Sequence, residues 1–269
     1  SFLSAYAGPT SYYPSNGELL TLWNVIFTGN DSLVNIQNIF IFFVFFLSSF
    51  YFVKSIGVNK YIALLFPALF LYSPVVLKEV GNQHVDLFFS LSFLYIISFL
   101  FEFIKTKSNL YILPLFISFG LLVGTKYLGV PYVVLPFIIF LFYFVQNIKN
   151  RKNWMVVVTY VVLALILFFF AGGFFYLRNL MIASNPIFPA EVKIGDFVVF
   201  SGYGNMTSEI MNRSLINNIS NIEYGELRYK ILKFIIRNGF QILLFVPVYL
   251  YVFIRFFILL FLVFKKDSG

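Results

Sequence analysis

Residues 154–176 read WMVVVTYVVLALILFFFAGGFFY, a stretch without a single charged side chain. A helix rises about 1.5 Å per residue, so about 20 apolar residues cross a bilayer core roughly 30 Å thick. This stretch therefore predicts a membrane-spanning helix. The whole chain has the same character, because 60% of its 269 residues are hydrophobic, 11% are charged and the mean hydropathy is +0.89. One soluble core could not bury so much apolar surface.

The same length rule predicts about seven spans along the chain, at 34–53, 61–77, 87–104, 110–125, 127–146, 154–176 and 239–264. We therefore expect an all-α fold, a polytopic bundle of transmembrane helices that forms a single domain over 1–269. The span 110–125 is short for a full crossing, and Arg255 inside the last span either snorkels or marks a helix break. The chain opens at Ser1 in a polar, aromatic stretch, which suggests a loop of a longer protein.

Charge in the short loops predicts the orientation of the chain. Nine Lys and Arg residues lie on one side, whereas the opposite short loops hold only Lys78 and Lys126. The positive-inside rule then places 1–33 and the loop 177–238 outside a cell membrane, with the C-terminal end in the cytoplasm. The formal charge of +8 does not indicate a nucleic-acid partner, because the basic residues do not gather on one soluble face. The absence of Cys excludes disulfides and thiolate metal sites.

The external segment 1–33 contains a predicted amphipathic helix. Its sequence GELLTLWNVIF repeats apolar side chains at spacings of three and four residues, which favours a helix lying on the membrane surface. Ser15 and Glu18 have the spacing of a capping box, so we expect the helix to begin just after Pro14. Capping explains Glu18 sufficiently, and contact with substrate is the alternative.

The second external element is KEVGNQHVD, residues 78–86, a polar connection between two nearly uncharged helices. A capping role at the start of the next helix explains Asp86, and a solvated turn explains Asn82 and Gln83. Neither explains His84, the only histidine of the chain. One histidine cannot define a zinc site, because several ligands must converge. We therefore predict no metal or other cofactor, and a divalent cation has no support at this stage.

The third element is GTKYLGVPY, residues 124–132, inside an otherwise apolar run. Gly124, Gly129 and Pro131 interrupt this run, so we expect two short helices joined by a tight external hairpin. Lys126 would then lie at the membrane surface. It either binds an anion, such as a phosphate or a carboxylate, or it snorkels to the lipid headgroups.

The fourth element is FFYLRNLMIASNPIFP, residues 174–189. Arg178 comes where a helix reaches the external surface. The Asn185-Pro186 pair and the Phe188-Pro189 pair after it impose turns or extended backbone. The planar guanidinium suits bidentate capture of a phosphate, and interfacial snorkelling is the alternative. Further along, apolar and basic residues between Leu227 and Arg237 predict a basic amphipathic helix.

Four motifs carry a resemblance when taken in order. They are YYPSNGELLTLW at 12–23, VDLFF at 85–89, GLLVGTKYLGV at 120–130, and YLRNL with SNPIFP at 176–189. Together they resemble the GT-C superfamily of membrane glycosyltransferases, and most of all the prokaryotic relatives of protein mannosyltransferases and lipid A aminoarabinose transferases. The resemblance implies transfer of a sugar from a polyprenyl-phosphate donor to a glycan, lipid or protein acceptor at the external face, among membrane lipids.

The resemblance also implies roles for single residues. Asp86 matches the second acidic residue at the mouth of the cavity, and we group His84 with it as catalytic. Lys126 and Arg178 match basic positions near the donor phosphate. Gln83 and Asn82, from the polar loop itself, and Glu18, as the alternative to its capping role, complete the expected substrate-binding set.

The family's first catalytic Asp lies upstream of the segment that begins this resemblance, so the chain alone is expected to be inactive. Two other classes stay open. An O-antigen ligase or polymerase also has many spans and a long external loop with Arg. A transporter would place ionisable residues at mid-membrane on broken helices.

Overall fold

The computed structural model describes residues 9–30, 33–82, 84–149, 154–194, 197–202, 247–259 and 262. The chain divides into two compact units. The helical unit comprises Pro14–Gly173 and Leu244–Gly269, and the small unit comprises Ser1–Tyr13 and Phe174–Leu243. Gln83 and the basic helix predicted between Leu227 and Arg237 lie outside the described residues.

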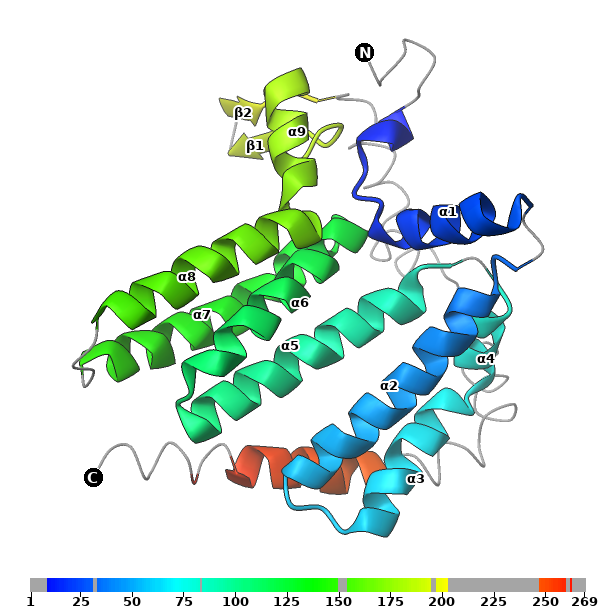
Figure 1. Ribbon diagram of the computed structural model, residues 1–269, viewed down its shortest axis with the longest axis vertical. Coiled ribbons are helices and arrows are strands. Elements are labelled where there is room, and N and C mark those ends of the chain that lie inside the picture. The colour runs from blue at the N-terminus through cyan, green and yellow to red at the C-terminus, as the bar shows by residue number, and fades with distance from the viewer. Residues whose placement is uncertain are drawn as a thin grey trace, which may run out of the picture. The chain divides into compact units, whose positions relative to one another are not determined.

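The helical unit confirms the predicted helical class (Figure 1). Its labelled helices are α1 Asn16–Thr28, α2 Ile36–Ser55, α3 Lys60–Leu71, α4 Pro74–Val80, α5 Asp86–Thr106, the 3-10 turn η2 Asn109–Tyr111, α6 Ile112–Thr125, α7 Gly129–Lys149, α8 Trp154–Phe168 and the π-helical turn η3 Phe169–Gly173. A further helix over Pro247–Leu259, drawn in orange-red, packs near the end of α2.

Four helices among the described residues are long and apolar enough to cross a membrane: Ile36–Ser55, Asp86–Thr106, Gly129–Gln146 and Met155–Ala183. The other predicted spans correspond to shorter apolar helices, at Lys60–Leu71, Asn109–Thr125 and Pro247–Leu259. The chain is therefore mostly helical, and the part of it that the structure describes contains four candidate membrane spans. Arg255 lies within the last short helix and donates a hydrogen bond to the backbone oxygen of Gly57 at 3.3 Å.

The prediction of one helix over 61–77 is wrong. The chain breaks after Leu71, and α4 begins at Pro74 with Ser73 as its N-cap. The Ser73 hydroxyl accepts a hydrogen bond from Val76 N at 3.4 Å, and proline at the first helical position lacks the N–H that a continuing helix would need. With 12 residues, α3 is about 18 Å long, less than a bilayer core.

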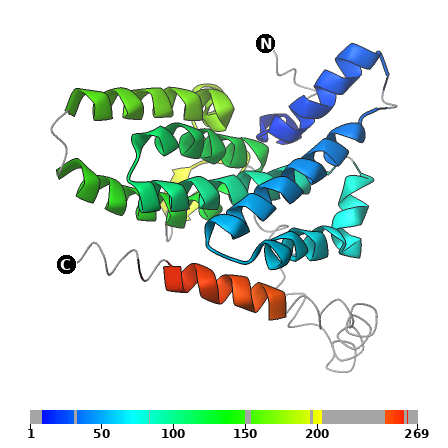
Figure 2. The same ribbon diagram turned by 60° about the horizontal axis from the view of Figure 1, so that its bottom comes forward.

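Helix α6 lies at the centre of the helical unit, packed against α5 on one side and α8 on the other. The two views show α2 beside α3 and α6 among α5, α7 and α8 (Figures 1 and 2). Phe103 of α5 and Phe119 and Leu122 of α6 are among its fully buried side chains. Burial of each such side chain contributes about 1.5–3 kcal/mol, which holds these helices in register.

Small residues let α6 approach the η3 turn very closely. Gly120 and Gly124 lie one helical turn apart on α6, and a Cβ on Gly120 would be 2.6 Å from the backbone oxygen of Phe168. A Cβ on Gly124 would be 2.6 Å from Gly172 Cα. Such a small-xxx-small face allows backbones to touch, which is a common way for membrane helices to associate.

Helix α1 contacts the ends of α6 and α2. The Asn16 amide donates a hydrogen bond to the backbone oxygen of Ala171 at 2.6 Å, which ties the start of α1 to the η3 turn. The predicted apolar face is exposed, with Trp23 and Phe27 stacked on it. Its place at a membrane surface stays a prediction. The capping box is wrong, because Ser15 is the N-cap residue but its side chain makes no capping hydrogen bond.

The described part of the small unit contains η1 Pro9–Tyr12, α9 Phe174–Ala183, and the strands β1 Val192–Ile194 and β2 Phe197–Phe200. The strands pair antiparallel in a two-stranded sheet. The sequence predicted only a loop here, since runs of three and four strand residues are too short to give a clear alternating pattern.

Candidate functional site: a polar cluster at the start of α5

The central contact of the candidate site joins two residues far apart in the chain. Asp86 is the first residue of α5, and Lys126 directly follows α6. These two helices pack together, so the start of one meets the end of the other. The Lys126 Nζ atom lies 2.5 Å from Asp86 Oδ1. The structure therefore brings together two of the residues that the sequence singled out.

The expected capping role of Asp86 needs correction. Val85 is the N-cap residue, and Asp86 lies within the first turn of α5. A carboxylate there still interacts favourably with the positive end of the helix dipole. Its side chain, however, is directed to Lys126 instead of to the backbone of its own helix.

The ion pair is open to solvent. The side chain of Asp86 is 53% exposed and that of Lys126 is 35% exposed. Exposed pairs contribute only about 0–1 kcal/mol to stability, because water solvates each charge well. An incoming anion could therefore take over the ammonium group of Lys126 at small cost.

A buried amide holds the backbone of the loop before α5. Asn38 of α2 is 1% exposed, and its Nδ2 atom donates to the backbone oxygens of Asn82 at 2.6 Å, Glu79 at 3.2 Å and His84 at 3.3 Å. Sequence reasoning missed Asn38. No local signal separates Asn38 from the neighbouring amides Asn35 and Gln37 at the start of this apolar run, although buried polar groups almost always find partners.

Three possible metal ligands gather in this loop. One ligand atom each from Glu79, His84 and Asp86 lies within 4.8 Å of the others, and they form the one such group in the described part of the chain. The Glu79 Oε2 atom is buried without a hydrogen-bond partner. Such a set of oxygen and nitrogen donors could hold a divalent cation. The ammonium of Lys126 opposes one, because it already places a positive charge beside Asp86.

The start of α1 closes one side of the loop. Gly17 is buried against Val85, where a Cβ would overlap the valine side chain. The neighbouring Glu18 is exposed and its side chain forms no ion pair with another described residue, so it does not join the cluster. Asn82 takes part through its backbone oxygen, and Gln83 lies outside the described residues.

Arg178 belongs to α9 in the small unit, where neighbouring groups engage its guanidinium. Its Nε and Nη2 atoms donate to Asn179 Oδ1 at 3.2 and 3.0 Å, and Nη2 also donates to the backbone oxygen of Tyr12 at 3.0 Å. The Phe175 ring lies 5.3 Å from its Cζ atom. The buried Asn179 amide donates to the same Tyr12 oxygen at 2.9 Å. The expected convergence of Arg178 with Asp86 and Lys126 stays a prediction.

Comparison of the chain with models of known families, with curated proteins and with solved structures finds no match. The class of protein consequently comes from the fold and the cluster themselves. It is a mostly helical chain, and four helices among its described residues are long and apolar enough to cross a membrane. A carboxylate, an ammonium and an imidazole lie close to one another at the end of one of these helices.

Proposed function

We propose that the chain is part of a membrane glycosyltransferase that moves a sugar from a polyprenyl-phosphate donor to an acceptor at the external face. The observation that supports this proposal best is the contact between Asp86 and Lys126 beside His84. Transfer from a lipid phosphate needs a cation for the departing phosphate and a group that handles the acceptor proton. This cluster contains the cation, with a carboxylate and an imidazole beside it.

In the proposed reaction, an acceptor hydroxyl oxygen attacks the anomeric carbon of the sugar. The bond from that carbon to the phosphate oxygen breaks, and the phosphate leaves with the electron pair. Lys126 releases Asp86, binds the leaving phosphate and stabilises the negative charge that grows on that phosphate. The acceptor proton passes to a carboxylate, which on the resemblance is the family's upstream Asp, with Asp86 and His84 at the mouth of the cavity.

Arg178 has a second proposed role at the donor phosphate. A guanidinium can bind two oxygens of one phosphate at once, which a lysine cannot do with the same geometry. Its Nε and Nη2 atoms donate to Asn179 and Tyr12, so bidentate binding of a phosphate requires the guanidinium to exchange at least one of these partners for a phosphate oxygen.

The η3 turn interrupts a candidate span, which is a feature of transporters. In the described residues, however, the groups packed at this break are Gly120, Gly124 and the Asn16 amide. None of them is ionisable. The glycosyltransferase proposal is therefore favoured over a transporter that couples ions at this break.

Polyprenyl monophosphate is the right probe for this proposal, because it is the product whatever sugar is transferred. Its binding would be measured with the protein expressed from its complete gene and purified into nanodiscs. We expect Lys126→Gln to weaken binding about ten- to a hundredfold, since a charged hydrogen bond is worth about 1.5–3 kcal/mol. Lys126→Arg should retain most of it.

Asp86→Asn gives the sharper test, because it removes the competing anion from Lys126. It should strengthen phosphate binding and weaken sugar transfer. Lys193→Gln is a matched control, since Lys193 is also paired with a carboxylate, Glu191, at 2.6 Å. Equal binding by wild type, Lys126→Gln and the control would refute the proposed role of the cluster.

A further inference from the structure

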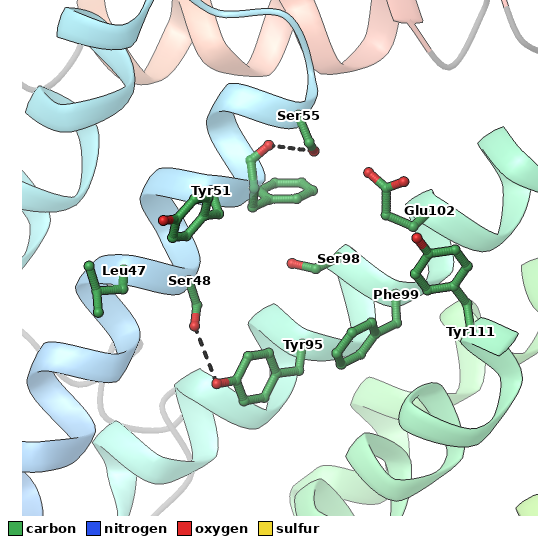
Figure 3. A pocket seen from close by; sticks show the side chains of 10 residues that line it. Leu47, Ser48, Tyr51, Ser55, Tyr95, Ser98, Phe99, Glu102 and Tyr111 are labelled. Atoms are coloured by element: carbon green, nitrogen blue, oxygen red, sulfur yellow. Dashed lines mark hydrogen bonds between the residues drawn. The ribbon is translucent and has the colours of Figure 1, made fainter.

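A cavity with several polar side chains in a mostly apolar wall lies between α2 and α5, along the parts of these helices farthest from Asp86. Its volume is about 440 Å³, and Ser48, Tyr51, Ser55, Tyr95, Ser98 and Glu102 contribute to its wall (Figure 3). Tyr111 of η2 also lines it. Several hydroxyls and one carboxylate within a pair of apolar helices are costly to desolvate unless they have partners.

The serine hydroxyls of this cavity have already donated their protons. Ser98 Oγ donates to the backbone oxygen of Leu94 at 2.7 Å, and Ser55 Oγ donates to that of Phe52 at 2.8 Å. Ser48 Oγ donates to the Tyr95 hydroxyl at 3.2 Å. A hydroxyl has one proton and two lone pairs, so each serine offers only acceptor capacity to a ligand. The serines are therefore suited to a hydrogen-bond donor, whereas the hydroxyls of Tyr51, Tyr95 and Tyr111 can donate as well as accept.

Glu102 adds a negative charge to the same wall. Its side chain is 24% exposed and forms an ion pair with Lys105, whose Nζ atom lies 3.8 Å away and also donates to the backbone oxygen of Ser55 at 3.4 Å. A bound ammonium would share this carboxylate with Lys105. Figure 3 shows its carboxylate facing the space between Ser55 and the Tyr111 hydroxyl. A carboxylate is an acceptor with two oxygens, and it repels a phosphate or another anion.

Aromatic rings complete the cavity. Tyr95 and Phe99 are stacked with their centroids 5.7 Å apart, and Tyr51 and Tyr111 lie on the same wall. Ring faces attract cations, and rings combined with a carboxylate are a common environment for amines. From these acceptors, this charge and these rings, we infer that the cavity binds a primary ammonium group.

The number of N–H donors decides between kinds of amine. A primary ammonium has three donors for Glu102, Ser55 and Ser98, whereas a quaternary ammonium has none. The source of the ammonium is either a phospholipid headgroup or a small soluble amine. Both α2 and α5 are candidate membrane spans, so a lipid headgroup and a soluble amine are the two sources to be tested.

The test uses the purified full chain in detergent and native mass spectrometry. Equal amounts of phosphatidylethanolamine, phosphatidylcholine and phosphatidylglycerol are added, and retained lipid is measured before and after addition of free ethanolamine. We expect wild type to retain the ethanolamine lipid about tenfold more than the choline lipid. Release of that lipid by millimolar ethanolamine would identify the soluble amine as the stronger source, and continued retention would identify the lipid.

Two variants connect the preference to this cavity. Glu102→Gln should abolish it, and Ser98→Ala should reduce it by a smaller factor without a change of charge. Glu191→Gln is the matched control, because Glu191 is also paired with a lysine and does not line the cavity. Equal retention of ethanolamine and choline lipids by wild type, together with no binding of free ethanolamine, would overturn the inference. The inference is also overturned if the Glu102→Gln variant still prefers the ethanolamine lipid over the choline lipid and still binds free ethanolamine as wild type does.

Discussion

Replacement of Asn38 by leucine tests how the fold positions the candidate site. The two side chains have similar size, but leucine cannot donate a hydrogen bond. Asn38→Leu would leave the backbone oxygens of Asn82, Glu79 and His84 without the amide that now binds them. We expect the loop before α5 to loosen and the cluster around Asp86 to lose its geometry.

The magnitude follows from the number of protons on the amide. The Asn38 Nδ2 atom carries two protons, so two of the three contacts are full hydrogen bonds at any moment. A buried carbonyl that loses its partner costs about 1–3 kcal/mol. The loop is partly exposed, so water replaces some of this loss, and we expect a net destabilisation of about 2–3 kcal/mol. For a chain of this size, that is a fall in unfolding temperature of roughly 4–12 °C.

Two measurements report this effect. Thermal unfolding in detergent gives the change in stability, and hydrogen exchange of a peptide covering residues 79–86 gives the local opening. Gln37→Leu is the matched control, because the Gln37 amide donates to Thr21 Oγ1 at 2.8 Å and does not contact the loop. The control should leave exchange of 79–86 unchanged. If Asn38→Leu unfolds within about 2 °C of wild type and exchanges at the same rate, the assigned role of Asn38 is wrong.

Two further substitutions give independent tests. Gly124→Ala places a methyl group against Asn16 and Gly172, so we expect the free energy of unfolding to fall by about 1–3 kcal/mol, measured by thermal unfolding. Gly81→Ala is the control and should be nearly neutral, because its Cβ would lie 3.7 Å from the backbone oxygen of Lys78. An unchanged melting temperature for Gly124→Ala would contradict the close packing. Arg178→Lys should lower turnover of a polyprenyl-phosphate donor about ten- to a hundredfold at equal amounts of folded protein. Normal turnover with a lower melting temperature would mean that Arg178 only anchors Asn179 and Tyr12.

Hydropathy predicts most helices of this chain because apolar runs of helical length report burial or membrane insertion directly. The hairpin between α6 and α7 could be predicted for a second reason, since Gly129 and Pro131 interrupt the run. The structure shows why glycine is needed there, because a Cβ on Gly129 would be 2.8 Å from the backbone carbon of Leu122. The break at Ser73 and Pro74 carried an equally clear signal, but continuous hydropathy across it favoured one long helix.

The candidate site is less predictable than the helices. Asp86, His84 and Lys126 could be singled out because polar residues in short loops between apolar helices are unusual. Their proximity depends on the packing of α5 against α6, which no local pattern encodes. The role of Asn38 is similarly hidden, because its three acceptors are backbone atoms more than 40 residues away in the chain.

The side of the membrane on which the cluster lies is the central claim, and single cysteines test it directly. The chain contains no Cys, so Asn82→Cys and Ser108→Cys need no background substitutions. An impermeant thiol reagent applied to intact cells should label the cysteine at Asn82 and spare the one at Ser108, which should react only after the membrane is permeabilised. Labelling of Ser108→Cys with protection of Asn82→Cys would place the Asp86 cluster in the cytoplasm and contradict an external glycosyltransferase site.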